Sequence, residues 1–214
     1  YKRQVWRTPE AASADMPALQ VMDNLISNGR TGIFDLNVNL PQRVLGGGAY
    51  LMDMADASAY VMSGSPKEGQ TLDDVRDILL EQIDKIRAGE FDEDLLKAVV
   101  SNMKLEVQNS LTSNASRADF YVDAFVNGID WADQVAELSA IDKVTKEDVV
   151  KMANKYLGRD NYVAIYKRRG QDPNELKMPR PELTPIEMNR DLTSQLLSEI
   201  RNSKVEPIEP VFID

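Results

Sequence analysis

The chain has 214 residues, with 35 acidic and 25 basic side chains and a formal net charge of −10. It contains neither histidine nor cysteine. This composition excludes triads and dyads built on histidine, imidazole or thiolate metal sites, and disulfides, so a self-contained hydrolase is disfavoured. The acidic balance argues against non-specific binding to nucleic acid or to anionic membranes, which need a cationic surface.

The length fits one large domain, or one domain with an appendage. No apolar run approaches the ~20 residues of a membrane span, and no secretory signal opens the chain. The chain begins at Tyr1 rather than at a methionine. The compartment therefore stays open, and a periplasmic or otherwise extracytoplasmic location is favoured over a cytoplasmic one.

Strand and helix patterns alternate at the start of the chain. A strand is expected over residues 4–8, and a helix with one apolar face over residues 14–27. A second helix is expected from Thr31 toward Val38. Two further strands are expected over residues 49–54 and 58–63.

Helices dominate the next part of the chain. Apolar residues at helical spacing predict four helices, over residues 71–88, 92–112, 115–126 and 131–138. A fifth helix is expected to start after Thr145, whose side chain can cap it together with Asp148, and to end at Leu157. The last strand is expected over residues 161–167. This order predicts an α+β fold, with a mostly antiparallel mixed sheet packed against a layer of helices.

Proline separates the end of the chain from the rest, because six of the ten prolines lie in the last 44 residues. Residues 171–185 are polar and aperiodic, which is typical of an extended linker. A short amphipathic helix is expected over residues 191–202, followed by an extended segment over 206–214. We therefore expect a lobe over residues 1–170 and a Pro-rich linker with a short helix over residues 171–214.

Several local motifs have simple structural interpretations. The glycine run from Gly46 to Gly48 lacks the Lys-Ser/Thr ending of a phosphate-binding loop, so we interpret it as a connection before a strand. Acidic clusters at Asp73 and Asp74 and in residues 92–94 are typical of helix starts. Asp53 and Asp56 lie near the strand pair, where they could approach a site. Trp6 and Trp131 lie on apolar stripes and are expected in the core.

Arg43 and Tyr50 are the candidate substrate-binding residues. They are seven residues apart, on either side of the glycine run. A guanidinium and a phenol placed together can bind a peptide carbonyl or stabilise an oxyanion. The alternative is a surface arginine and a tyrosine in the core or at its rim.

The order of elements and several local phrases resemble the insulinase/pitrilysin-type zinc metallopeptidases, a family that includes mitochondrial processing peptidase. The resemblance covers about residues 3–170. The sequence motifs that carry the resemblance lie at residues 15–22, 28–34, 65–69, 86–96, 141–157 and 161–168. Arg43 and Tyr50 have the spacing of a pair that binds substrate in that family.

The resemblance implies a protein that encloses peptides between two bowl-shaped halves. In that family an inverted His-x-x-Glu-His motif and a distal Glu hold zinc, and the motif Glu is the general base. That motif belongs to a first lobe, and this chain has no histidine. The chain is therefore similar to the second, non-zinc lobe of one half, followed by an interdomain linker. Zinc is expected in the missing lobe of the parent protein, and this chain alone is expected to be non-catalytic.

The implied partners are the remaining lobes of the same polypeptide, or a sister subunit, and a peptide substrate. In active members of the family the arginine–tyrosine pair belongs to the half that lacks zinc. Here Gly46 to Gly48 replace the usual Gly-Leu, and Pro41 interrupts the preceding helix. Two alternatives stay open: the lobe of a catalytically inactive family-like subunit that acts as a scaffold or peptide-binding partner, and an unrelated α+β interaction domain.

Overall fold

The computed structural model describes residues 1–170 and, after them, residues 174, 176, 178, 179, 181–184, 189 and 192–204. The chain divides into two compact units, Tyr1–Arg169 and Gly170–Asp214. In the second unit the predicted short helix is present as α7 (Gln195–Asn202), which Ser194 caps by accepting a hydrogen bond from the backbone of Leu197. The extended segment predicted over 206–214 lies outside the described residues.

A four-stranded antiparallel sheet forms the centre of the first unit. Its strands lie in the order β2-β3-β1-β4, and every neighbouring pair is antiparallel. The first strand of the chain is therefore internal, and the last strand lies beside it at one edge. The strands are β1 (Lys2–Arg7), β2 (Gly46–Met52), β3 (Ala59–Ser65) and β4 (Tyr162–Tyr166).

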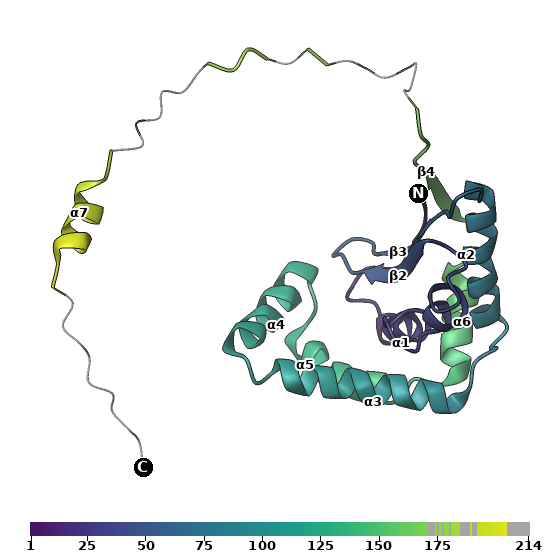
Figure 1. Cartoon of the computed structure of the whole chain (residues 1–214). Helices are drawn as coiled ribbons and strands as arrows, with labels where there is room; N and C mark the ends of the chain where they lie inside the picture. Colours follow the sequence, from purple (N-terminus) through teal and green to yellow (C-terminus); the bar gives the residue numbers. More distant parts are fainter. Residues whose placement is uncertain are drawn as a thin grey trace. The chain divides into compact units, whose positions relative to one another are not determined.

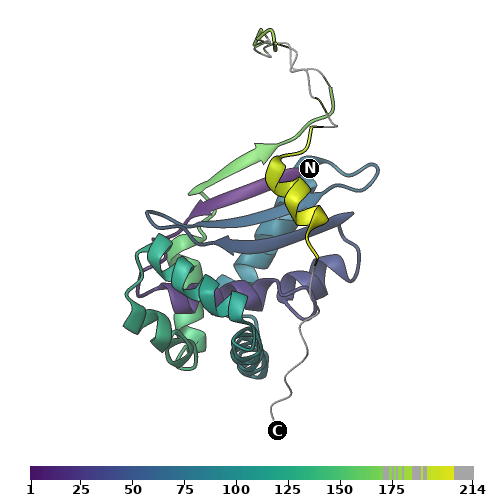
Figure 2. The same ribbon diagram turned by 90° about the vertical axis from the view of Figure 1, so that its left-hand side faces the viewer.

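The helices of the first unit lie on one side of this sheet (Figures 1 and 2). This arrangement confirms the predicted α+β fold with a helical layer on an antiparallel sheet. No helix of the described residues is both long and apolar enough to span a membrane. The helices are α1 (Met16–Ile26), the π-helix η1 (Asp35–Asn39), α2 (Leu72–Arg87), α3 (Glu93–Ser110), α4 (Asn114–Asn127), α5 (Trp131–Ile141) and α6 (Lys146–Tyr156).

The core forms between the sheet and the apolar stripes of the helices. In α2 the residues at helical spacing are fully buried, as the periodicity predicts. On β1 and β3, alternate residues face the helices, among them Trp6 and Tyr60. The fully buried stripe of α2 consists of Val75, Leu79, Ile83 and Ile86.

Local hydrogen bonds define where two of the helices begin. Thr71 and Asp74 form a reciprocal capping box at the start of α2, and Thr145 and Asp148 form one at the start of α6. Each box satisfies backbone N–H groups that the first helical turn leaves without a partner. The predicted cap at Thr145 is confirmed.

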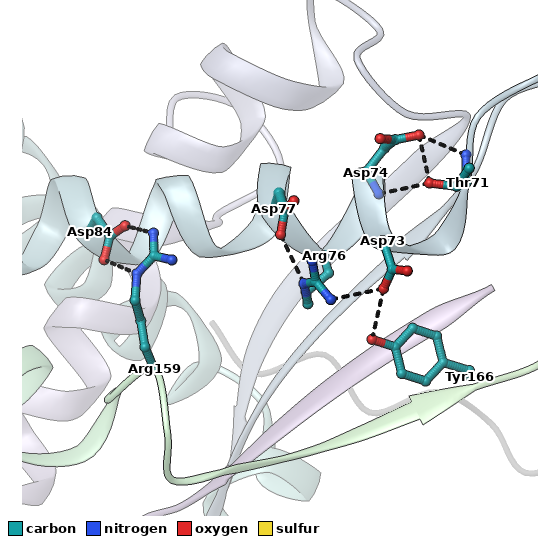
Figure 3. A network of polar contacts seen from close by, with 8 residues as sticks. All are labelled: Thr71, Asp73, Asp74, Arg76, Asp77, Asp84, Arg159 and Tyr166. Atoms are coloured by element: carbon teal, nitrogen blue, oxygen red, sulfur yellow. Dashed lines mark hydrogen bonds and ion pairs between the residues drawn. The ribbon is translucent and has the colours of Figure 1, made fainter.

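Side chains on the exposed face of α2 tie this helix to the last strand (Figure 3). Asp73 accepts hydrogen bonds from Arg76 at 2.8 Å and from the hydroxyl of Tyr166 in β4 at 3.3 Å. Asp84 forms an ion pair with Arg159, which precedes β4. These contacts attach the edge strand to the helical layer.

A further tie joins the two ends of the first unit. Asp15, just before α1, accepts hydrogen bonds from Lys155 and from the hydroxyl of Tyr156 in α6, the latter at 2.7 Å. The indole N–H of Trp6 donates to the backbone oxygen of Gly158 at 2.7 Å. The segments around Asp15 and Tyr156, both of which resemble the peptidase family in sequence, are therefore in contact. The polar residues Asp15, Lys155 and Tyr156 hold these segments together.

Three sequence interpretations need correction. Residues 46–48 are part of β2 rather than a connection, and they pair with Ser65, Gly64 and Ser63. Trp131 is not a core residue: it is 43% exposed and stacks on Tyr121 at 4.2 Å between ring centroids. The second helix forms as a short π-helix, because backbone N–H groups there donate to carbonyls five residues back, as Leu40 does to Asp35.

Candidate peptide-binding face

The face of the sheet that points away from the helices carries one row of apolar residues, next to a row that contains Arg3 and Ser63. One row across the sheet contains a residue from each strand, because Tyr50 of β2 pairs with Val61 of β3, Val61 with Val5 of β1, and Val5 with Val163 of β4. Within residues 1–170 no helix covers this row (Figures 1 and 2). We call these four residues, with Ile165 beside them on β4, the outer face.

Exposure of apolar residues distinguishes the outer face from an ordinary solvated sheet surface. Val163 is 64% exposed, Ile165 47% and Tyr50 38%. An antiparallel sheet with one face in water normally carries polar residues on that face. Exposed apolar patches are where proteins bind partners, so the exposed residues Tyr50, Val163 and Ile165, with Val61 buried at 3%, define the candidate surface.

Arg43 lies at the β2 edge of the sheet, in the loop between η1 and β2. Its backbone N–H donates to the carbonyl of Val38 at 2.8 Å, and its carbonyl accepts from Gln70 at 3.2 Å. The preceding residue, Gln42, has a φ of 53°, a left-handed conformation that is uncommon for residues other than glycine. The loop therefore holds Arg43 in a defined position through contacts on both sides.

The guanidinium of Arg43 is already paired. It donates two hydrogen bonds to the carboxylate of Glu81 on α2, at 3.2 and 2.7 Å. This pair lowers the pKa of Glu81 to about 2, with a further contribution from Lys85, whose Nζ lies 3.2 Å from the same carboxylate. Because an arginine carries five N–H donors, the bidentate pair leaves donors for a second acceptor.

The structure does not join Arg43 to Tyr50 directly. Among the described residues there is no hydrogen bond between their side chains. The glycine segment is extended strand, so Tyr50 lies roughly 13 Å along β2 from Gly46. Arg43 thus lies in the loop before β2, and Tyr50 lies well along that strand. That both contact one substrate stays a prediction.

Sequence inspection missed Glu81, which lies 38 residues after Arg43 and fixes its side chain. Glu81 is one of several acidic residues on the exposed face of α2, and nothing in its local pattern distinguishes it. The only local signal would have been an acidic residue four positions before Lys85, which is the usual spacing of a helical ion pair.

The donor set does not fit zinc. The chain has no histidine or cysteine, and the described residues hold no group of three carboxylates that could bind a metal ion. Protein zinc sites use imidazole and thiolate ligands together with carboxylates. No chemical step of this chain is therefore assigned to a metal.

Comparison with known proteins rests on structure. No family model matches the chain, and no curated protein matches its sequence. A protease from Helicobacter pylori has a similar fold, with a TM-score of 0.72 and 16% identity over 76% of this chain. A candidate zinc protease from Bordetella pertussis is similar with a TM-score of 0.68 and 17% identity over 78% of this chain.

The inactive peptidase domain of a candidate zinc protease from Bordetella parapertussis is similar over 80% of this chain, with a TM-score of 0.70 and 17% identity. The chain has an insulinase-like peptidase fold. It spans 93% of each Bordetella structure but only 40% of the Helicobacter protease. The matched region is therefore nearly the whole of each Bordetella structure and less than half of the Helicobacter protease.

Proposed function

We propose that this chain is the non-zinc lobe of a peptidase-like protein and that it forms part of the wall of a peptide-binding chamber. The observation that carries the proposal is the insulinase-like fold in a chain without histidine or cysteine. Zinc in the parent protein would then be held by another lobe, and this lobe would contribute surface rather than chemistry.

The outer face supplies the surface for a neighbouring lobe. Burying Val163 and Ile165 removes apolar area that is now in water, and each fully buried aliphatic side chain contributes about 1.5–3 kcal/mol. The Helicobacter protease contains more than twice the length matched by this chain. A second lobe of the same polypeptide, or a sister subunit, is the partner that this comparison supports.

The β2 edge supplies the surface for a peptide. β2 is an edge strand, so one row of its backbone N–H and C=O groups faces no partner strand within the described sheet, and of this row the Gly47 carbonyl accepts from the Asn39 amide at 3.1 Å. An extended peptide can add to such an edge through main-chain hydrogen bonds. A peptide lying along β2 would reach the free donors of Arg43 at one end and the phenol of Tyr50 farther along.

A second candidate is a lobe of a catalytically inactive, family-like subunit that serves as a scaffold or peptide-binding partner. The similarity to a structure described as an inactive peptidase domain favours it. The two candidates differ only in the rest of the protein, because neither assigns catalysis to this chain.

The test combines the sequence and the activity of the complete protein that contains this chain. The first candidate predicts a His-x-x-Glu-His motif elsewhere in that protein, bound zinc by elemental analysis, and hydrolysis of unstructured peptides. It also predicts that the purified 214-residue chain retains no stoichiometric zinc and cleaves none of these peptides. A complete protein without the motif and without activity would favour the second candidate, and zinc-dependent hydrolysis by the 214-residue chain would refute both.

A further inference from the structure

The four strands of the sheet carry no acidic residue, although the chain as a whole is strongly acidic. All 35 aspartates and glutamates lie in the helices, in the loops and in the end of the chain. The strands do carry cations, because Arg3 and Arg7 alternate with buried residues along β1 and lie on the side without helices. In a chain with a net charge of −10, this side of the sheet is therefore positively charged.

Arg3 lies next to the outer face, in the neighbouring row of the sheet. It pairs with Ser63 of β3 on one side and with Ile165 of β4 on the other. Ser63 in turn pairs with Gly48 of β2, where an added Cβ atom would meet nothing within 4 Å. A small side chain and an absent one thus leave open space beside Arg3, in which a side chain from another molecule or lobe can lie.

Arg3 has no anionic partner in the part of the chain that the structure describes. Its side chain is half-buried, it forms no ion pair there, and its Nε atom is buried without a hydrogen-bond acceptor. Its Cζ atom lies 5.5 Å from the centre of the Tyr1 ring, a contact that supplies no acceptor for the Nε–H group. Because buried polar atoms are almost always hydrogen-bonded, this free donor indicates an acceptor that comes from a partner.

The residues around Arg3 are of the types that form the centres of protein–protein interfaces. Such centres are rich in tyrosine, methionine and arginine, and they are poor in lysine, glutamate and aspartate. The same side of the sheet presents Tyr50 and Met52 of β2, which are 38% and 44% exposed. Arginine and tyrosine are also prominent among the residues that carry most of the binding energy of an interface. This composition favours a protein surface as the occupant.

We propose that the neighbouring lobe carries a carboxylate opposite Arg3, and that the two form a bidentate ion pair within the interface. The inference rests on the proposed function, which places a neighbouring lobe on the outer face, and it adds the chemistry by which that lobe is recognised. A guanidinium presents its N–H donors in a plane and binds a carboxylate through two parallel hydrogen bonds. Covering Arg3 without supplying an anion would leave a desolvated, unpaired charge, which is unfavourable.

The test uses the complex of the 214-residue chain with the remaining part of the complete protein, obtained by coexpression and measured by analytical ultracentrifugation. Arg3→Gln should weaken the association by at least about 30-fold, because it leaves the partner's carboxylate buried and unpaired. The control, Arg7→Gln, removes the same charge from the same face of β1. Arg7 is exposed at the other end of the strand, so the control should change the affinity by less than about threefold.

A matched pair of substitutions at Gly48 tests the charge without changing Arg3. Gly48 lies two strands, or about 10 Å, from Arg3, and its open surroundings accept a longer side chain. A glutamate there can pair with Arg3 and compete with the partner's carboxylate, whereas a glutamine of the same size has no charge. Gly48→Glu should therefore weaken the association by at least about tenfold more than Gly48→Gln. This comparison decides the question if Arg3→Gln fails to fold, which circular dichroism shows.

A charge exchange identifies the residue of the partner. Each aspartate and glutamate of the remaining part is replaced in turn by arginine and combined with Arg3→Glu in this chain. The exchange at the opposing carboxylate should restore the affinity of the Arg3→Glu chain by at least about tenfold. A purely structural role of Arg3 predicts no such restoration, so its absence at every position would overturn the inference.

The outcomes separate this inference from the proposed function. Val163→Lys combined with Ile165→Lys tests whether a lobe covers the outer face at all. If that double variant disrupts the complex while Arg3→Gln and Gly48→Glu do not, the lobe covers the outer face without an anion on Arg3, and only the inference is overturned. If the two parts form no complex, or none of these variants changes the affinity, both are overturned. Equal losses in Arg3→Gln and Arg7→Gln would also overturn the inference.

Discussion

Asp23 shows how a single side chain in this lobe depends on its surroundings. It projects from α1 toward β2 and β3, where burial raises the pKa of its carboxyl from 3.8 to about 7. The negative charge of Asp53 acts in the same direction, whereas the Leu51 backbone and the Tyr60 hydroxyl oppose it. Glu106 and Glu137 line the same hollow, which holds no cation among its described residues.

This pKa predicts a pH-dependent stability. Between about pH 4 and pH 7 the unfolded chain has lost the Asp23 proton and the folded chain keeps it, so the free energy of unfolding falls as the pH rises. A difference of about three pKa units corresponds to on the order of 4 kcal/mol. Asp23→Asn should abolish the part of this decrease in the free energy of unfolding that comes from Asp23. Urea denaturation at about pH 4.5 and 7.5 measures the decrease in each protein. Equal falls in the variant and the unchanged protein would contradict the prediction.

Lys2 and Gln4 show a limit of residue patterns. Both are fully buried on the helical face of β1, next to Trp6. The aromatic rings of Tyr162 and Tyr166 in β4 lie 5.7 and 5.4 Å from the Lys2 ammonium. The alternation of polar and apolar residues predicts a strand that starts at residue 4, whereas β1 starts at Lys2. The pattern treats Lys2 as a solvent-exposed residue. It cannot show that tyrosines about 160 residues later surround this lysine.

At the scale of elements, the glycine run decides how β2 can pack. A Cβ atom added at Gly47 would lie 2.6 Å from the backbone oxygen of Ser63 and 2.9 Å from the ring of Phe34. At Gly48 the same atom would meet nothing within 4 Å. Gly47 therefore permits the close approach of β2, β3 and the segment before η1, whereas Gly48 lies on the open face.

This contrast gives a matched pair of substitutions. Gly47→Ala should destabilise the protein by about 1–3 kcal/mol, because the clash involves backbone and an aromatic ring that cannot move freely. Gly48→Ala should be neutral or slightly stabilising, since alanine restricts the unfolded chain without a clash. Chemical denaturation of the two variants measures the difference, and equal stabilities would show that the strand spacing does not depend on Gly47.

At the scale of the whole molecule, the outer face predicts association with another lobe. Val163→Lys combined with Ile165→Lys should weaken the association of this chain with the remaining part of the complete protein by at least about tenfold, because charge would enter an apolar interface. Val135→Lys, at a residue of α5 that is 65% exposed, is the control. Analytical ultracentrifugation of the separately expressed parts measures both, and an unchanged affinity in the double variant would place the interface elsewhere.

Much of the helical layer could be predicted from the sequence. The stripe of α2 and the caps at Thr71 and Thr145 depend on residues three or four positions apart, and such contacts form within one helix. The fold class followed from the order of these elements. The ion pair of Arg43 with Glu81 and the position of Asp53 near Glu137 could not be predicted, because their partners come from other elements.

The sequence by itself determined the locations of most helices, the absence of imidazole and thiolate ligands, and the α+β class, since these follow from composition and from short-range contacts. The tertiary structure decided which face of the sheet is left without helices and which acidic residues meet. Both depend on the packing of segments far apart in the chain: α1, α3 and α5 contribute Asp23, Glu106 and Glu137 to one hollow. The strand order β2-β3-β1-β4 likewise brings Tyr50 and Val163 into one row across the sheet.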